Sequence, residues 1–132
     1  MKREEFRAEG LAEPISHYAD AVRAGDLLFV SGCVPVDGEG LLVGGDDVVV
    51  QAEQVFANIG AVLAAAGASA ADVVKVTVYL TDIDDRPRIN PVRQRFFGDA
   101  RPASTLIEVG KLAIPGAKLE VEAVAVLAQD RR

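Results

Sequence analysis

KLEVEAVAV, residues 118–126, has the alternation of a β-strand and determines how the rest of the fold must be arranged. Side chains alternate across a strand, which puts one row on each face: Glu120, Glu122, Val124 and Val126 against Leu119, Val121, Ala123 and Ala125. Apolar residues dominate both rows, as is typical of a strand covered on both sides. Because a buried carboxylate is costly unless it is paired, the row with the two acids is expected to reach water, a partner or a ligand.

The segments before this strand predict alternating strands and helices. Periodicity and turn residues predict two short strands within 17–32 joined by a turn at 24–26, a helix over 48–66, a strand over 73–80, a helix from Pro87 or Pro91 to 97, a strand over 104–109 and the closing strand over 118–128. Asp46 or Asp47 is the expected N-cap of the first helix. Residues 1–16 are polar, contain Gly and Pro, and are expected to lie over the surface. The order β-β-α-β-α-β-β predicts an α+β two-layer domain over 1–132, with a mixed sheet and both helices on one face. The uncovered sheet face then favours an oligomer.

Composition limits the classes of function. The chain has 132 residues, a net charge of -6 and a mean hydropathy of +0.21. The acidic balance argues against binding to nucleic acid. No signal peptide and no apolar run long enough to cross a bilayer are evident, so we expect a cytoplasmic protein with no membrane partner. One Cys and one His give no metal-ligand set, and no cofactor or metal is expected.

No strong catalytic motif is present, and each candidate residue has a structural alternative. Cys33 follows a strand, but no base stands near it, which favours the role of a small buried hydrophobe over that of a nucleophile. Tyr18 has two equally supported roles: it places a phenol in a pocket, or it is a half-buried aromatic residue of a strand with its hydroxyl in water. Asn90 precedes Pro91 and is typical of a helix cap. Glu120 is either a solvated acid or a functional carboxylate.

Several blocks of the sequence, taken together and in order, resemble the reactive-intermediate deaminase family RidA (formerly YjgF). The blocks are HYADAVRAGDLLFVSGCVPVD (17–37), DVVKVTVYLTDIDD (72–85), the Asn90 region with Phe96 and Phe97, RPASTLIEV (101–109) and KLEVEAVAV. The resemblance implies a chorismate-mutase-like fold and a homotrimer whose sheets form a central barrel, with sites between subunits. It also implies hydrolysis of reactive imines and enamines to a carbonyl compound and ammonia.

The resemblance assigns roles to individual positions. It implies that Glu120 orients the attacking water and that Tyr18, Ser31, Gly32 and Asn90 line the site. The full candidate set has Glu120 and Tyr18 as catalytic residues, with substrate contacts from Ser31, Gly32, Cys33, Asn90, Ser104, Thr105 and His17.

One departure from the family pattern affects substrate choice. The deaminases carry an Arg that binds the substrate carboxylate where this chain has Ser104, and a Cys where it has Leu106. A hydroxyl supplies neither the charge nor the fork of a guanidinium. Arg101 is one candidate for a displaced cation, and His17 replaces a Pro at the expected mouth of the cleft.

Three hypotheses follow. The first is a trimeric deaminase of imines or enamines other than the usual 2-imino acids, such as an aminomuconate-like intermediate. The second is a non-catalytic binder of small molecules. The third, ribonuclease or translation inhibitor, conflicts with the acidic charge.

Overall fold

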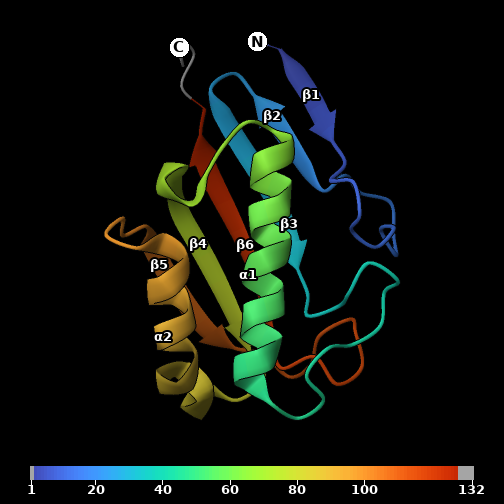
Figure 1. Ribbon diagram of the computed structural model, residues 1–132, viewed down its shortest axis with the longest axis vertical. Helices are drawn as coiled ribbons and strands as arrows, with labels where there is room; N and C mark the ends of the chain where they lie inside the picture. The colour runs from blue at the N-terminus through green and yellow to red at the C-terminus, as the bar shows by residue number, and fades with distance from the viewer. Residues whose placement is uncertain (1, 128–132) are drawn as a thin grey trace.

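The computed structural model describes residues 2–127 as one mixed sheet with two helices packed on one side (Figure 1). The strands are β1 (Arg3–Phe6), β2 (Ala21–Ala24), β3 (Leu27–Cys33), β4 (Val73–Leu80), β5 (Ala103–Glu108) and β6 (Leu119–Val126). The α-helices are α1 (Val48–Ala65) and α2 (Arg86–Phe97), with short 3₁₀ turns η1 (Ala70–Asp72) and η2 (Ile83–Asp85). This arrangement confirms the predicted α+β class with a mixed sheet and helices on one face.

The closing strand lies inside the sheet, in the order β1-β2-β3-β6-β4-β5. It pairs antiparallel with both β3 and β4, while β4 and β5 run parallel. Its Leu119 row is buried beneath the helices, and its Glu120 row faces the open side. The predicted division of the two rows is therefore correct. The expected continuation of this strand to residue 128 lies outside the described residues.

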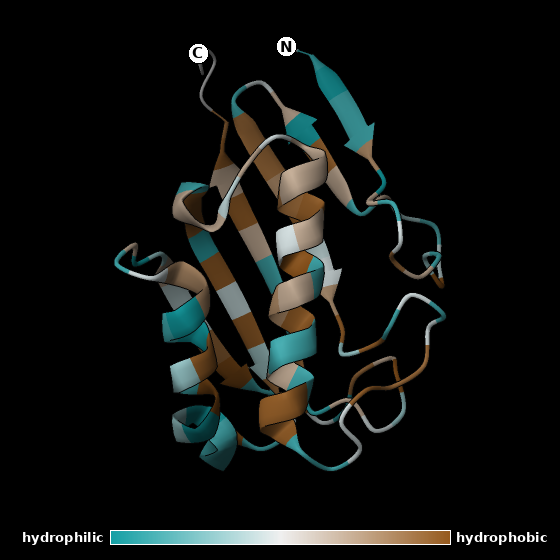
Figure 2. Ribbon diagram, in the orientation of Figure 1, coloured by the Kyte–Doolittle hydropathy of each residue, from teal (hydrophilic) through white to brown (hydrophobic). Residues whose placement is uncertain are grey.

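One strand was not predicted. Residues 3–6 read REEF and form β1, which pairs with β2 at the edge of the sheet. The predicted order of elements has no strand here, because the pairing of an edge strand comes from backbone hydrogen bonds, and REEF offers only Phe6 to pack against the core. Figure 2 shows this strand as hydrophilic.

The first helix is the main element covering the sheet. Asp47 is its N-cap and accepts from the Val49 N–H at 2.9 Å. Nine of its residues are buried: Val48, Gln51, Ala52, Val55, Phe56, Asn58, Ile59, Val62 and Leu63. α1 has 18 residues, and Glu53 is its only charged residue. By length and composition alone the helix could therefore cross a membrane, so the expectation that the chain has no such run was wrong. In the structure it is a core helix of the two-layer domain.

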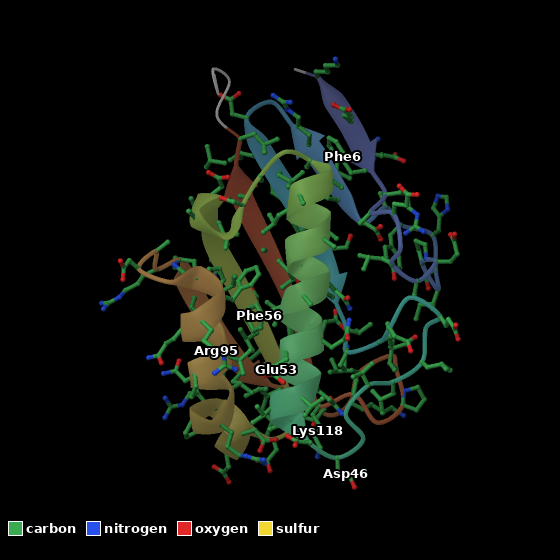
Figure 3. All side chains as sticks on the ribbon, in the orientation of Figure 1. Phe6, Asp46, Glu53, Phe56, Arg95 and Lys118 are labelled. Carbon is green, nitrogen blue, oxygen red and sulfur yellow. The ribbon has the colours of Figure 1, made fainter. Side chains whose placement is uncertain are left out.

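The two helices also contact each other. Phe56 of α1 packs against Phe96 and Phe97 of α2, with ring centroids 5.1 and 5.9 Å away. Arg95 extends from α2 toward Glu53 of α1, and their Nη2 and Oε2 atoms lie 3.2 Å apart (Figure 3).

The opposite face of the sheet has no helix over it among residues 2–127. Phe29 is 46% exposed there, and Leu27 and Val126 are 40% and 39% exposed. Leu27 pairs with Val126, and Phe29 with Val124, so these side chains form one apolar area. An exposed apolar sheet face of this kind is typical of an interaction surface.

Candidate functional site

A cavity of about 340 Å³ opens beside the C-terminal end of β3. Its walls come from four parts of the chain: the segment before β2, the end of β3 with the loop after it, the inner face of α1, and the start of β6 with the preceding loop. The principal lining residues are Tyr18, Asp20, Ser31, Gly32, Cys33, Asn58, Val62, Ile114 and Glu120. Five of the nine predicted site residues are in this set.

A β-bulge shapes the cavity wall. Val30 pairs with Ala123 but Cys33 pairs with Val121, so β3 has one more residue than β6 between these two pairs. The extra residue falls in the Ser31–Gly32 stretch. Bulges bend a strand and re-aim its side chains, which is why this part of β3 borders a cavity and does not continue the regular ladder.

Glu120 is half-buried at the cavity wall, at the point where the bulge leaves space beside β6. No side chain or backbone group within residues 2–127 donates a hydrogen bond to its carboxylate, and no cation lies within 4.0 Å of it there. Burial, and to a lesser degree the charge of Glu122, raise the pKa of Glu120 above its usual range. The carboxylate is therefore free to bind a water or a ligand proton.

Gly32 makes room for the observed position of the Glu120 carboxylate. A Cβ at position 32 would collide with Glu120 Oε2 and would lie 2.8 Å from Glu120 Cδ. The backbone at Gly32 is not in the left-handed region, so glycine is not needed here for its backbone conformation. It instead leaves space for a neighbouring side chain. Glycine at this position lets the acid lie directly against the bulge.

Ser31 connects the bulge to the segment that carries Tyr18. Its Oγ donates to the Ala19 carbonyl at 2.6 Å, and its N–H donates to the Asp20 carbonyl at 3.0 Å. Since the hydroxyl proton is engaged, Ser31 is left with an acceptor oxygen for a ligand. Tyr18 remains 45% exposed at the cavity, and its hydroxyl has no hydrogen-bond partner in the described part of the chain.

Two residues that position the cavity walls were not predicted. Asp20 accepts from Arg7 Nη1 at 2.7 Å and from the Ala8 N–H at 2.9 Å, which fixes the N-terminal segment over the cavity. Asn58 donates to the carbonyls of Val34 and Val36, both at 3.0 Å, and so holds the loop that follows β3. A signal for Asn58 is present in the sequence, as it is a polar residue on the apolar stripe of α1.

Cys33 lines the cavity but is not suited to attack a substrate. Burial first, and then the charges of Asp20 and Glu120, raise the pKa of its thiol to about 12. A thiol with this pKa is almost entirely protonated at neutral pH, and the thiolate is the reactive form. The favoured expectation, a structural cysteine, agrees with this environment.

The other predicted residues lie elsewhere in the single chain. His17 is exposed and does not line the cavity, although its neighbours Ser16 and Tyr18 do. Asn90 is exposed inside α2, whose N-cap is Asp85, so its predicted capping role is wrong. The wrong expectation came from reading Pro91 as the helix start, whereas Pro91 lies within the helix.

Ser104 and Thr105 lie on β5, away from the cavity, and they face opposite sides of the sheet. Ser104 pairs with the buried Val76 and so faces the helices, where its Oγ accepts from Arg93 Nη2 at 2.8 Å. Thr105 faces the open side, where Lys75 Nζ donates to its Oγ1 at 2.7 Å. The two therefore cannot both face one cleft. Within residues 2–127, no three His, Cys, Asp or Glu side chains are placed to hold a metal ion.

Comparison with known proteins gives the family. The family model described as Endoribonuclease L-PSP matches residues 10–127. The chain belongs to this family, the RidA/YjgF family. The structure of a proposed endoribonuclease from Thermotoga maritima has a TM-score of 0.90 and 40% identity, covering 97% of this chain and 99% of that one.

Two further members carry functional names. The 3-aminoacrylate deaminase RutC of Acinetobacter baylyi is 34% identical over 125 residues, which cover 95% of this chain and 98% of that protein. E. coli TdcF, solved with bound serine, has a TM-score of 0.87 and 32% identity, covering 95% of this chain and 99% of that one. Members of the family thus include a deaminase and a protein that binds a small amino acid.

Proposed function

We propose that the protein is a hydrolytic deaminase that converts a reactive imine or enamine into the carbonyl compound and ammonia. The observation that supports this most directly is Glu120, a half-buried carboxylate at a cavity with no hydrogen-bond donor or cation of residues 2–127 beside it. The similarity to a named 3-aminoacrylate deaminase points to the same chemistry.

The reaction needs one proton acceptor that later becomes a donor. Glu120 takes a proton from water as the oxygen adds to the C=N carbon, which gives a carbinolamine. The same carboxyl group returns the proton to the nitrogen. The resulting carboxylate then takes the hydroxyl proton of the carbinolamine as the C–N bond breaks, so that ammonia leaves, the carbonyl forms and the carboxyl group passes its proton to solvent; an enamine reacts in this way as its imine tautomer. A raised pKa suits both steps, because a group that titrates closer to neutral pH both accepts and donates protons efficiently. Tyr18 and the acceptor oxygen of Ser31 position the substrate beside this acid.

We propose a homotrimer in which the open sheet faces form a central barrel and the cavities lie between subunits. The exposed apolar area around Phe29 supports association through this face. The positions of Asn90 and Ser104 outside the cavity of their own chain fit a site that a neighbouring copy completes. We further place the protein in the cytoplasm, where a lone unpaired cysteine stays reduced.

RNA cleavage is not proposed, despite the description of the family model. The net charge of -6 opposes binding to a phosphate backbone. The cavity itself carries Glu120 and Asp20, and neither acid favours an anionic polymer.

The central test measures ammonia release from a broad panel of enzymatically generated imines and enamines that includes compounds other than the usual 2-imino acids. Wild-type protein should accelerate the release, and Glu120→Gln should reduce the acceleration by at least about a hundredfold, the usual size of a general acid-base contribution. Glu122→Gln is the matched control, because Glu122 lies two residues away on β6 and faces the same side of the sheet. This variant should retain most activity.

Two results would count against the proposal. Full activity in Glu120→Gln would exclude this residue as the proton carrier. Binding of ligands without acceleration of any imine or enamine in a broad panel would identify the protein as the small-molecule binder of the second hypothesis.

The assembly has its own test. Phe29→Glu places a charge in the exposed apolar area and should convert a species of three times 13.9 kDa into monomers, measured by light scattering after size exclusion. Leu41→Glu, at a loop residue that is 60% exposed, is the control and should leave the mass unchanged.

A further inference from the structure

One wall of the Glu120 cavity is a segment without regular structure. This segment, residues 11–16, is called the strap, and it belongs to none of the helices and strands in the described part of the chain. Its cavity-lining residues are Leu11, Ala12, Glu13, Ile15 and Ser16. The Leu11 N–H donates to the Ala8 carbonyl at 3.3 Å, and the Ser16 carbonyl accepts from the Tyr18 N–H at 3.2 Å. These bonds join residues that are close in sequence, so they do not fix the strap relative to the sheet.

Asp20 ties the strap to the strand that borders Glu120. Its Oδ2 accepts from Arg7 Nη1 at 2.7 Å and from the Ala8 N–H at 2.9 Å. Arg7 in turn extends to the strap, where its Nη2 lies 3.3 Å from Glu13 Oε2. The backbone carbonyl of Asp20 accepts from the Ser31 N–H at 3.0 Å. Because the Asp20 side chain is only 11% exposed, its pair with Arg7 is screened less by water than a surface pair is.

The strap region also packs on the loop that follows β3. A Cβ at Gly38 would lie 2.5 Å from the carbonyl oxygen of Gly10, the residue before the strap, and a Cβ at Gly40 would lie 3.9 Å from Ala12 Cβ. Gly38 has no positive φ, so glycine leaves space for the adjoining backbone there and is not needed for its conformation. The strap is therefore held by Asp20 and by this packing.

The strap adds two large apolar side chains to the cavity. Ile15 lines it while remaining 63% exposed, and Leu11 lines it while packing in part against the core. Val36, Val62 and Ile114 are apolar residues of the other walls. The cavity of about 340 Å³ falls in the range of about 300–1,000 Å³ that is usual for ligand pockets, so it has room for more than a reacting C=N group. Covering the exposed surface of Ile15 with an apolar part of a ligand is favourable.

We propose that Leu11 and Ile15 select substrates with an aliphatic substituent, and that Asp20 is the positioning residue that holds both side chains at the cavity. This inference rests on the proposed deaminase function and names the class of substrate: an imine or enamine that carries several apolar carbons beyond the reacting group. Burial of each such carbon raises affinity by about fourfold, so three carbons give up to about sixtyfold.

The test compares ligands that differ only in this substituent. Binding of pyruvate and of 4-methyl-2-oxopentanoate is measured by titration calorimetry, and so is binding of the uncharged amides of both. The two members of each pair share one head group, so the ratio of their affinities isolates the effect of three additional carbons. Wild-type protein should prefer the longer compound by about ten- to sixtyfold in at least one pair.

Ile15→Ala tests the strap at its most exposed apolar residue. It should lower the preference for the longer compound by about three- to tenfold. Because Ile15 is mostly exposed, the free energy of unfolding should hardly change, so the lost preference cannot come from unfolding. Leu41→Ala is the matched control, since Leu41 is also an exposed apolar loop residue but lies outside the cavity lining. It should keep the wild-type preference.

Two further variants move the strap without removing its side chains. Asp20→Asn keeps the size of the side chain and removes the charge that pairs with Arg7, and Gly38→Ala forces the Gly10 carbonyl to move. Both should lower the preference by about three- to tenfold, whereas a merely structural role would weaken both compounds of a pair equally. Glu5→Gln breaks an exposed ion pair of β1 and is the control for Asp20→Asn; it should change neither affinity.

Several results would overturn the inference: equal affinity for both members of each pair, binding of neither pair, or an unchanged preference in Ile15→Ala. So would Asp20→Asn and Gly38→Ala variants that keep the preference or weaken both compounds equally. Failure of the deaminase function gives a different result. A preference that depends on the strap, combined with no release of ammonia from any imine or enamine, would contradict the reaction and leave the role of the strap intact.

Discussion

Gly32→Ala tests whether activity depends on the position of the Glu120 carboxylate, because it moves this group without removing it. The new Cβ would lie 2.8 Å from Glu120 Cδ and in collision with Oε2. Ordinary contact between carbon atoms is about 3.5–4.0 Å, so the carboxylate must move by about 1 Å. The alanine itself is tolerated by the backbone, because Gly32 does not have a positive φ.

The effects on stability and on activity should differ strongly. No described residue is hydrogen-bonded to the Glu120 carboxylate, so its displacement costs little more than an off-rotamer side chain, about 0.5–1.5 kcal/mol in the free energy of unfolding. Displacing a catalytic group by 1 Å reduces rates by about a hundredfold, which corresponds to about 2.7 kcal/mol in the barrier. Activity should therefore fall much further than stability.

The assay compares release of ammonia from the enamine with urea unfolding of the same preparations. Gly60→Ala is the matched control, because a Cβ there would meet Phe96 Cε1 at an acceptable 3.5 Å and would replace a helical glycine. It should keep full activity and gain about 0.5–1 kcal/mol of stability. Full activity in Gly32→Ala would refute the assignment of the carboxylate as a positioned base. A loss of stability as large as the loss of activity would refute the separation of the two.

The remaining predictions concern pH, reactivity and packing. Because Glu120 must be ionised to accept a proton and its pKa is raised, the acid limb of kcat/KM should lie above the ordinary glutamate range, and Glu122→Gln should move that limb to lower pH by removing the nearby negative charge. For the same reason Glu120→Gln should raise the free energy of unfolding at neutral pH, and this gain should decline as the pH falls through the pKa of folded Glu120 and vanish below the pKa of the unfolded residue. Cys33, with a thiol pKa of about 12, should be alkylated by iodoacetamide far more slowly in native than in urea-unfolded protein, and Cys33→Ala should retain activity. Gln51→Leu should lower stability by about 1–3 kcal/mol, measured by urea unfolding, because three backbone groups lose the buried amide that pairs with them, whereas Gln94→Leu at an exposed position should change it little.

The sequence predicted the strands and helices that have strong periodicity. The strand over 73–80 was predicted with the observed bounds, and the helix starting at Val48 is capped by Asp47, one of the two residues expected. These segments follow local rules of alternation and capping. β1 escaped prediction because its pairing with β2 is a tertiary contact that leaves no apolar pattern in REEF.

The site was predicted less completely, for a physical reason. Ser31 and Glu120 come together because the end of β3 pairs antiparallel with the start of β6 at a bulge, and Tyr18 joins them through the hydrogen bonds between Ser31 and the segment before β2; the resemblance named all three positions. A bulge has no reliable signature in a single sequence. The contact of Arg93 with Ser104 was equally inaccessible, since it depends on how α2 lies over β5.

The two acids on the closing strand have different roles, which explains why both stand on one row. Glu122 is exposed and accepts a hydrogen bond from the Tyr79 hydroxyl at 3.0 Å, and this hydrogen bond is the main reason that the pKa of Tyr79 is raised above its usual range. Glu120 has no such donor and lies against Gly32 at the cavity. The fixed charge of Glu122 therefore raises the proton affinity of its neighbour without competing for the substrate. If Glu120 is the proton carrier of the proposed reaction, burial first and the charge of Glu122 second would set the pH at which it works.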